Sequence, residues 1–370
     1  MTTIPIIEEY RSRLARQPRS GAYSFGTGRL AVLSAQLLGI QTLEQLANQV
    51  FSLEQLKQVL DQAGYPQAAE PETRIRLGRQ AAARELKSAA PQSVLARALL
   101  LEQDLHNLKL FLKYLRSTAE QGGVEREAEI PSLLQAWVYP EAYVAAEELY
   151  RALLEQSASE RPAYGALAQL LDWAREEESE WQRDYGMQGL DARLDQRRFI
   201  GLLDLAEVAW QAGDRETATY LRAYTELRAD MANYSTALRL LKGGYRAEIY
   251  ARSCVAGGRV SPEEAVQAYR QGAAGLDQHY ARSAAAYLVT YGQRYREGEG
   301  GALSLGQDRL LAAFAQLGQE PGASAARVAS YFIYRELEAR NLRLLLSSRQ
   351  QAERSAVYRK LRPNYQGGVS

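Results

Sequence analysis

An acidic residue and an asparagine recur at one spacing, beside an apolar helical stripe, at three places in this chain. The copy at 331–350 has Phe332, Arg335, Ala339, Leu342 and Leu346 on its stripe. The other copies span 98–115 and 224–241. Acid and asparagine stand three residues apart in each: Asp104 and Asn107, Asp230 and Asn233, Glu338 and Asn341. Each pair therefore shares one flank of its helix.

The spacing of the copies indicates a repeat of long units. The asparagines are 126 and 108 residues apart, and a glycine pair follows each stripe at 122–123, 243–244 and 367–368. Glycine commonly ends a helix because it adopts the left-handed conformation at little cost. The pattern predicts three helical units, at 1–122, 123–244 and 245–370. Ordinary helical solenoids repeat every ~34–47 residues, so each unit is predicted to be a small domain.

The residue types predict an all-α fold. Alternating runs of β-branched residues are absent, and Ala, Leu, Glu, Gln and Arg dominate. Two helix starts are well marked. Ser52 is a predicted N-cap, and Ser261 precedes a proline and two glutamates at 262–264.

Each acid–asparagine pair is predicted to be half-buried at the edge of its stripe. Buried polar groups need hydrogen-bond partners, and a helix crossing the stripe could supply them through its terminal N–H groups. These six residues are therefore predicted to lock the fold. The alternative is that the three carboxylates serve one functional site, but three equivalent units would hold them far apart.

Composition argues against several classes of partner. Lys and Arg total 45 against 44 Asp and Glu, a net charge of +1, so no strong field favours nucleic acid or an anionic membrane surface. The single cysteine, Cys254, suits a reducing cytosol and is predicted to be buried. The first residues do not resemble a signal peptide, and no window approaches the ~18 apolar residues of a membrane span.

Catalytic and metal-binding patterns are scarce in the sequence. The two histidines, His106 and His279, lie in different units, and HExxH, CxxC, P-loop and GxSxG motifs are absent. We expect His106 to be a solvated surface residue and His279 to have a packing role. The sequence therefore predicts no catalytic residue, no metal site and no cofactor.

The closing motif resembles a known family. The segment YFIYRELEARNLR (331–343) is similar to the signature Y-[FIV]-x-x-K-E-x-E-x-x-N-L-R of the C-type subunits of V/A-type ATP synthases, the counterparts of the eukaryotic V-ATPase d subunit. Arg335 stands at the usual lysine. Segments 104–109, 190–203 and 255–266 resemble further family motifs. Departures occur at Ala31, where arginine is usual, and at Tyr234 and Ser235.

The resemblance implies a non-enzymatic adaptor. Members of the family have three similar helical domains that form a funnel with pseudo-threefold symmetry. One face docks on the membrane-embedded proteolipid ring, and the funnel receives the shaft formed by subunits D and F, so that the adaptor rotates and transmits torque. This chain is then expected to be cytoplasmic and peripheral to the membrane through the complex, with no span of its own.

The ring-facing surface is predicted from segments that mix Arg, Tyr and small apolar residues. The best candidates are Tyr23–Leu33, Leu190–Phe199 and Leu303–Leu310, one per unit. Within them the candidate docking residues are Tyr23, Arg29, Arg197, Phe199 and Arg309.

Two other functions remain open from the sequence. One is an all-α scaffold or repeat-type protein-binding module outside any ATPase. The other is an all-α enzyme, for instance of the terpenoid-synthase type, although paired Asp-rich magnesium motifs such as DDxxD are absent.

Overall fold

The computed structural model confirms the all-α class. It describes residues 4–18, 23–89, 94–120, 129–155, 165–181, 186–319, 324–349 and 354–363, which form helices and loops and no strand. None of the helices within these ranges is both long enough and apolar enough to cross a membrane.

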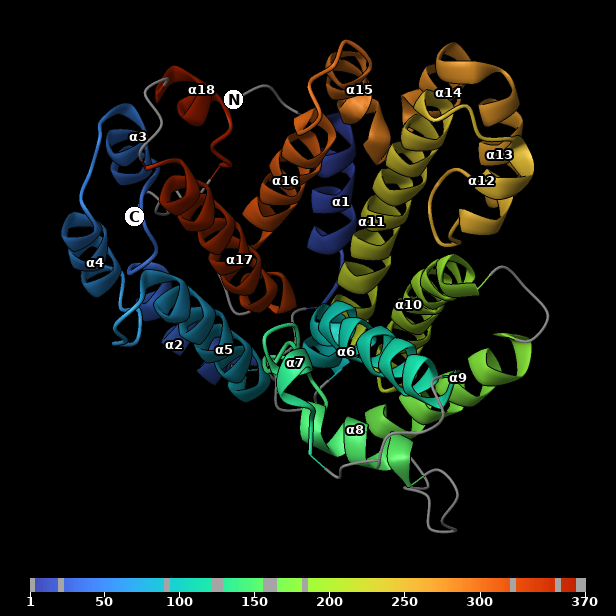
Figure 1. Cartoon of the computed structure of the whole chain (residues 1–370). Coiled ribbons are helices and arrows are strands. Elements are labelled where there is room, and N and C mark those ends of the chain that lie inside the picture. The colour runs from blue at the N-terminus through green and yellow to red at the C-terminus, as the bar shows by residue number, and fades with distance from the viewer. Residues whose placement is uncertain are drawn as a thin grey trace.

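The helices follow one another along the whole chain (Figure 1). The first third holds α1 (Pro5–Ala15), α2 (Ser24–Ser34), α3 (Ile40–Asn48), α4 (Leu53–Gln62), α5 (Pro71–Ala89) and α6 (Val94–Glu120). The middle holds α7 (Ser132–Gln135), α8 (Ala146–Leu154), α9 (Ala166–Trp181), α10 (Gly186–Gln211) and α11 (Arg215–Lys242). The last third holds α12 (Ala247–Ser253), α13 (Pro262–Arg270), α14 (Gly272–His279), η2 (Tyr280–Arg282), η3 (Ala284–Leu288), α15 (Val289–Arg296), α16 (Ala302–Ala315), η4 (Gln316–Gln319), α17 (Ala325–Ser348) and α18 (Arg354–Arg359).

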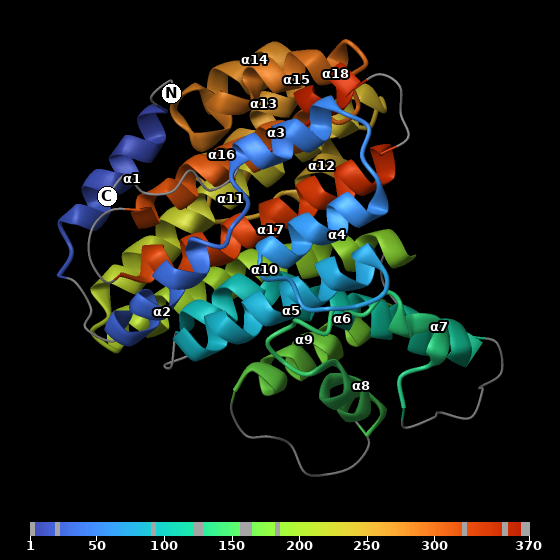
Figure 2. The ribbon, with the colours of Figure 1, turned by 90° about the vertical axis from the view of Figure 1, so that its left-hand side faces the viewer.

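Three long helices, α6, α11 and α17, carry the repeated motif, and we call them the motif helices. They contact one another pairwise. In Figure 1 their N-terminal ends lie near the middle of the molecule and their C-terminal ends point outward, and Figure 2 shows the arrangement from the side. The helix before each one, α5, α10 or α16, packs against it, and α6 and α17 also pack against α10 and α5. The motif helices therefore form the centre of the fold.

Local signals set several helix ends as the sequence predicted. Ser52 and Ser261 each form a complete capping box with the residue three positions on. The second glycine pair ends α11, with Gly243 as C-cap and Gly244 at φ +70°. The other two pairs lie outside the described residues. The unit boundaries at 122/123 and 244/245 stay predictions.

Two hydrophobic clusters hold the helices together. The larger one runs through most of the molecule. The smaller one joins α3 and α4 to α18 and the C-terminal half of α17, with Leu43, Phe51, Leu342 and Val357 among its members. Segments from opposite ends of the chain thus share one core.

Candidate site on the three motif helices

The first acid–asparagine pair holds the loop between α7 and α8. The Asn107 side chain donates from Nδ2 to the Tyr139 carbonyl over 2.9 Å, and its Oδ1 accepts from the Tyr139 N–H over 2.8 Å. Asp104 Oδ1 accepts from the Val144 N–H over 2.9 Å. Both side chains are fully buried. We call this arrangement of one acid and one asparagine on a loop a clamp.

The second clamp repeats the first on α11. Asn233 makes the same double pairing with Val255, at 2.8 Å in each direction. Asp230 Oδ1 accepts from the Val260 N–H over 3.3 Å. A side chain at Gly258 would bring its Cβ within 2.2 Å of that Oδ1 atom. Only glycine therefore lets this loop approach the aspartate.

The third clamp, on α17, has the same asparagine and a different acid. Asn341 pairs with the carbonyl and N–H of Arg362 over 3.0 and 2.9 Å. The Glu338 carboxylate accepts from the Leu38 N–H at 2.5 Å, from the Tyr65 hydroxyl at 2.7 Å and from Arg335 at 2.5 Å. This clamp therefore holds residues from both ends of the chain.

The three acids hold equivalent positions in the fold. Each accepts the N–H of the residue just before a helix N-cap: Val144 before α8, Val260 before α13 and Leu38 before α3. In the first two clamps the asparagine-bound and acid-bound residues are joined by one short loop, 139 to 144 and 255 to 260. In the third, Arg362 and Leu38 take these places from opposite ends of the chain. We expected the terminal N–H groups of a crossing helix to donate these hydrogen bonds. That expectation is wrong, because backbone groups of loops make them.

The electrostatics of the acids differ between the clamps. Burial raises the pKa of Asp104 and of Asp230 to about 7 in each case, against the weaker opposing effect of backbone hydrogen bonds. Glu338 instead forms a buried ion pair with Arg335. Burial disfavours the charge of Arg335, but the interactions with Glu338, Tyr65 and Tyr331 together outweigh this and raise the pKa of Arg335. The third clamp is therefore a charged one.

A second feature of the motif helices is a charged pocket of about 180 Å³ where they converge. Its ionisable lining residues are Glu102, Arg198, Arg228, Asp308 and Arg340. Glu102, Arg228 and Arg340 come one from each motif helix. Sequence reasoning missed this cluster, because no spacing within one segment links residues on five different helices.

A buried ion-pair network, also missed, joins α5 to α17. Arg79 lies 2.9 Å from Glu336 and 3.0 Å from Glu141, and its guanidinium stands over the Tyr139 ring at 5.2 Å. Glu336 belongs to the closing motif at 331–343. The closing motif therefore pointed to Glu336, whereas no local pattern in the sequence indicated Arg79 or Glu141.

Two of the candidate docking residues are buried. Tyr23 packs inside and its hydroxyl lies 2.6 Å from Thr217 Oγ1, which ties the start of α2 to α11. Phe199 is buried beside the charged pocket. In the described structure both side chains contribute to internal packing, so our docking proposal below does not use them.

The three candidate docking arginines have separate surroundings. Arg29 is exposed on α2 and pairs with Glu85. Arg197 pairs with Glu176 on α9. Arg309 donates to the Tyr291 hydroxyl over 3.0 Å. No contact among the described residues brings these arginines together, and their role in docking stays a prediction.

The histidines and the cysteine were also placed by the structure. His106 is half-buried: its Nε2 lies 2.9 Å from the Trp137 carbonyl and its ring packs on Tyr139, so it is less solvated than expected. His279 is half-buried at the end of α14. Cys254 is buried as predicted, and burial raises the pKa of its thiol to about 11. Within the described ranges no group of three or more His, Cys, Asp or Glu residues could hold a metal.

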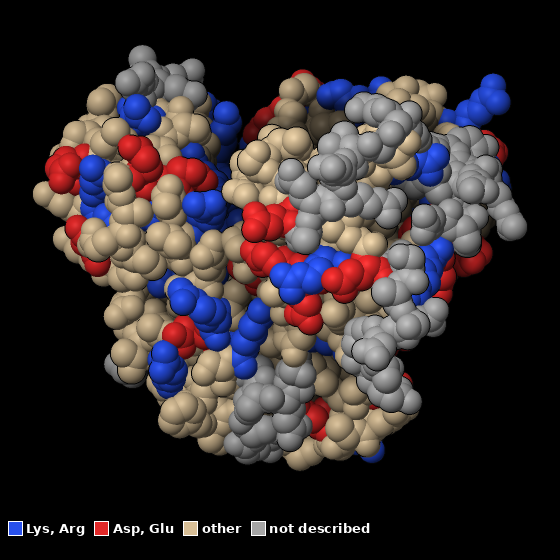
Figure 3. Space-filling model, turned by 60° about the horizontal axis from the view of Figure 1, so that its bottom comes forward, with Lys and Arg blue, Asp and Glu red and all other residues tan. Residues whose placement is uncertain are grey.

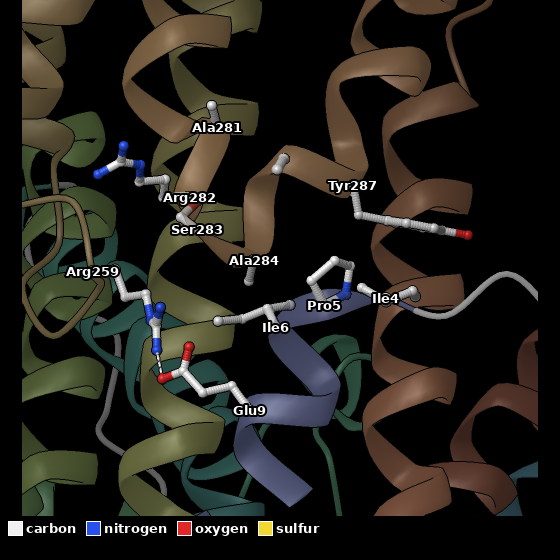
Figure 4. A pocket seen from close by; sticks show the side chains of 11 residues that line it. Ile4, Pro5, Ile6, Glu9, Arg259, Ala281, Arg282, Ser283, Ala284 and Tyr287 are labelled. Atoms are coloured by element: carbon white, nitrogen blue, oxygen red, sulfur yellow. Dashed lines mark hydrogen bonds and ion pairs between the residues drawn. The ribbon is translucent and has the colours of Figure 1, made fainter. Parts of the chain in front are cut away.

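A pocket of about 350 Å³ lies between the start of α1 and the η2–η3 segment (Figure 4). Its lining is mostly apolar, with Ile6 and Ala284 facing each other and a Glu9–Arg259 ion pair along one side.

The described residues on the face of the molecule in Figure 3 show no strong excess of either charge. On the face in Figure 3, acidic and basic side chains are interspersed among the described residues.

The fold and the clamps define an all-helical subunit in which each of three long helices is hydrogen-bonded to the backbone of loops elsewhere in the chain. A family model described as ATP synthase (C/AC39) subunit matches residues 27–359. The chain belongs to this family, whose members are subunits of V/A-type rotary ATPases. The resemblance seen in the motifs is thereby confirmed. A comparison with curated proteins gave no match.

Proposed function

We propose that this chain is the non-catalytic central-stalk adaptor of a V/A-type rotary ATPase. It would link the membrane proteolipid ring to the shaft of subunits D and F and transmit torque between them. It would act on the cytoplasmic side, peripheral to the membrane through the complex. The observation that carries the proposal is the threefold occurrence of one clamp on three helices that meet at the centre.

A torque-bearing adaptor has to resist twisting between its parts. Each clamp fixes a loop to a motif helix by backbone pairing of an asparagine amide, which a helix rotation of one residue would break. The third clamp and the small core tie the two chain ends together. These ties support a closed set of three units, and we propose that they surround a pseudo-threefold axis as a funnel.

Ion pairs across distant segments support the same interpretation. Arg79 joins α5 to α17 through Glu336, and Arg13 on α1 donates three hydrogen bonds to Glu226 on α11 at 2.8–3.1 Å. Bidentate arginine–carboxylate pairs add geometric definition as well as energy. A closed arrangement leaves two opposite ends, which suits two different partners.

The test is a binding assay with the full chain. Purified protein is mixed with detergent-solubilised proteolipid ring and, separately, with the D–F shaft complex, and bound fractions are measured. We expect both to bind and expect Arg29→Glu, Arg197→Glu and Arg309→Glu to weaken ring binding while circular dichroism stays unchanged. Arg151→Glu, at an exposed position on α8, is the matched control.

The outcomes separate the parts of the proposal. Unchanged ring binding in all three reversals would move the docking face elsewhere. A parent chain that binds neither partner would overturn the adaptor assignment. The same preparation should not hydrolyse ATP, and turnover that survives further purification would overturn the non-catalytic role.

A further inference from the structure

The charged pocket at the centre has more positive than negative charge. Arg198 and Arg228 donate to Glu102 over 2.7 and 2.9 Å. Arg340 and Arg362 both pair with Asp308, the latter over 2.7 Å. Within the pocket lining, three guanidinium groups share two carboxylates, which leaves an excess of one positive charge, and Arg362 adds a further one from outside the lining. Lys109, which also lies near Glu102, is paired with Asp195 at 2.6 Å.

The effect of this excess is visible on Glu102. Burial disfavours its negative charge, but the attraction of Arg198, Arg228, Arg340 and Lys109 together outweighs that effect and lowers the pKa of Glu102 to about 2. The carboxylate thus stays ionised and still leaves the cluster positive. Positive charge gathered in a recess attracts anions more strongly than the same charge on an open surface.

The arginines also have donors to spare. A guanidinium carries five N–H donors, and within the described contacts Arg198 and Arg228 each use one nitrogen, Nη2, on Glu102. Their side chains are only 13% and 16% exposed. A partly desolvated guanidinium is the group best suited to bind a carboxylate or phosphate through paired N–H bonds.

The pocket is reachable and large enough for such a group. The side chains of Glu102 and Arg340 are 49% and 43% exposed, so solvent reaches the site beside them. A water molecule occupies ~30 Å³ in the liquid, and the volume of about 180 Å³ is several times that. The rest of the lining includes Met231, Ala232 and Gln307, which add no charge.

We propose that the pocket between α6, α11 and α17 is an oxyanion-binding site that takes a carboxylate or phosphate group. The group comes either from a free inorganic anion or from an acidic side chain of a bound partner. Because the site is built from this chain alone, the proposal does not depend on the role in an ATPase.

The experiment measures binding of inorganic phosphate to the full chain by isothermal titration calorimetry at constant ionic strength set with chloride. Saturable binding is expected for the parent. Arg228→Gln removes one charge-assisted donor and should weaken binding by about tenfold. Arg222→Gln is the matched control, since Arg222 lies on the same helix and pairs with Glu207 outside the pocket.

A second variant keeps the test decisive if Arg228→Gln fails to fold. Glu102→Gln removes a competing carboxylate and frees two guanidinium groups, so phosphate should bind several-fold more tightly. An adventitious anion on the surface would respond to neither change. Equal phosphate affinity in the parent and in Glu102→Gln would overturn the proposal.

The source of the anion is decided with a second probe. If phosphate binds at millimolar concentrations or below, the site takes a free anion. If phosphate does not bind but a hexaglutamate peptide does, and Arg228→Gln weakens the binding of the peptide, the site takes a partner's carboxylate. Saturable binding of neither probe to the parent would overturn the proposal, whatever the result of the ring and shaft assays.

Discussion

The first two clamps and the third hold their loops with the same asparagine and with different acids. Asp104 and Asp230 accept a backbone N–H from a loop that lies 40 and 30 residues further along the chain, respectively. Glu338 accepts a backbone N–H from the far end of the chain and is also paired with Arg335 and Tyr65. The charged acid with several partners holds the residue that is by far the most distant along the chain.

The difference has a physical reason. Val144 and Val260 lie 40 and 30 residues from their acids, so holding them closes shorter segments and costs less entropy. Leu38 precedes Glu338 by 300 residues, and closing so long a segment needs stronger local interactions. The extra methylene of glutamate lets one carboxylate reach three donors at 2.5–2.7 Å. The third clamp thus has more bonds where connectivity helps least.

The largest effect is expected from Glu338→Gln. The amide cannot balance the buried Arg335 charge, and breaking a buried ion pair by removing one partner costs about 3–5 kcal/mol. Urea denaturation at pH 8 should show a loss of that size in the free energy of unfolding. The equivalent change in another clamp, Asp230→Asn, should raise stability at the same pH.

A double-variant cycle isolates the pair. Arg335→Met together with Glu338→Gln should recover part of the loss, because no unpaired charge then remains buried. Equal losses for Glu338→Gln and Asp230→Asn would show that the two kinds of clamp are electrostatically the same, contrary to the comparison.

The next largest effect is a pH dependence of stability that arises from Asp104 and Asp230. Their folded pKa of about 7 lies above the ordinary value of 3.8, so between these values the folded state binds more protons than the unfolded state. Stability should therefore fall as pH rises from 4 to 7, by about 1.4 kcal/mol per pH unit for each fully responding group. Lys87 and Arg97 face Asp104, while Glu226 and Arg259 face Asp230.

The measurement is urea denaturation at pH 5, 6, 7 and 8. Asp104→Asn and Asp230→Asn should each flatten the profile and should stabilise the protein above pH 7. His279→Gln serves as a control variant that leaves both aspartates in place. A parent profile that matches both asparagine variants across this range would contradict the raised pKa values.

The sequence was sufficient to find the six clamp residues and to predict that they need hydrogen-bond partners. It placed them half-buried, whereas all six are buried, and that they lock the fold stays a prediction. The pattern carries this information because acid and asparagine lie on the helix that they serve, at a spacing fixed by the helix itself. It could not identify the partners. Tyr139, Val255 and Arg362 contribute only backbone groups, so their side chains give no signal, and Leu38 reaches Glu338 only through the folding of the whole chain.

The candidate docking residues illustrate a second limit. Tyr23 and Phe199 suited an interface by residue type, but the same types suit a core. Tyr23 meets Thr217, 194 positions away in the chain, and no local pattern distinguishes that contact from an exposed position. The pocket arginines Arg198 and Arg228 were missed for the same reason, since Glu102 lies on a different helix from either.

The smallest effect, and the one expected to be alike in every clamp, is that of replacing the asparagines. Asn107→Leu, Asn233→Leu and Asn341→Leu each remove two hydrogen bonds at 2.8–3.0 Å from one loop residue. The loop N–H and carbonyl lose their partners, which should cost about 1–3 kcal/mol at each site. Thermal and urea denaturation measure this loss against Gln278→Leu, which replaces an exposed amide on α14 and should change stability by less than about 0.5 kcal/mol.

Because the amide pairing has the same geometry in all three clamps, the three stability losses should agree. The stability changes caused by replacing the acids should instead differ in sign between the clamps. A much larger loss at Asn341 would show that closure of the chain ends depends on the asparagine as well as on Glu338. Unchanged melting curves at all three positions would show that loop and helix separate without cost.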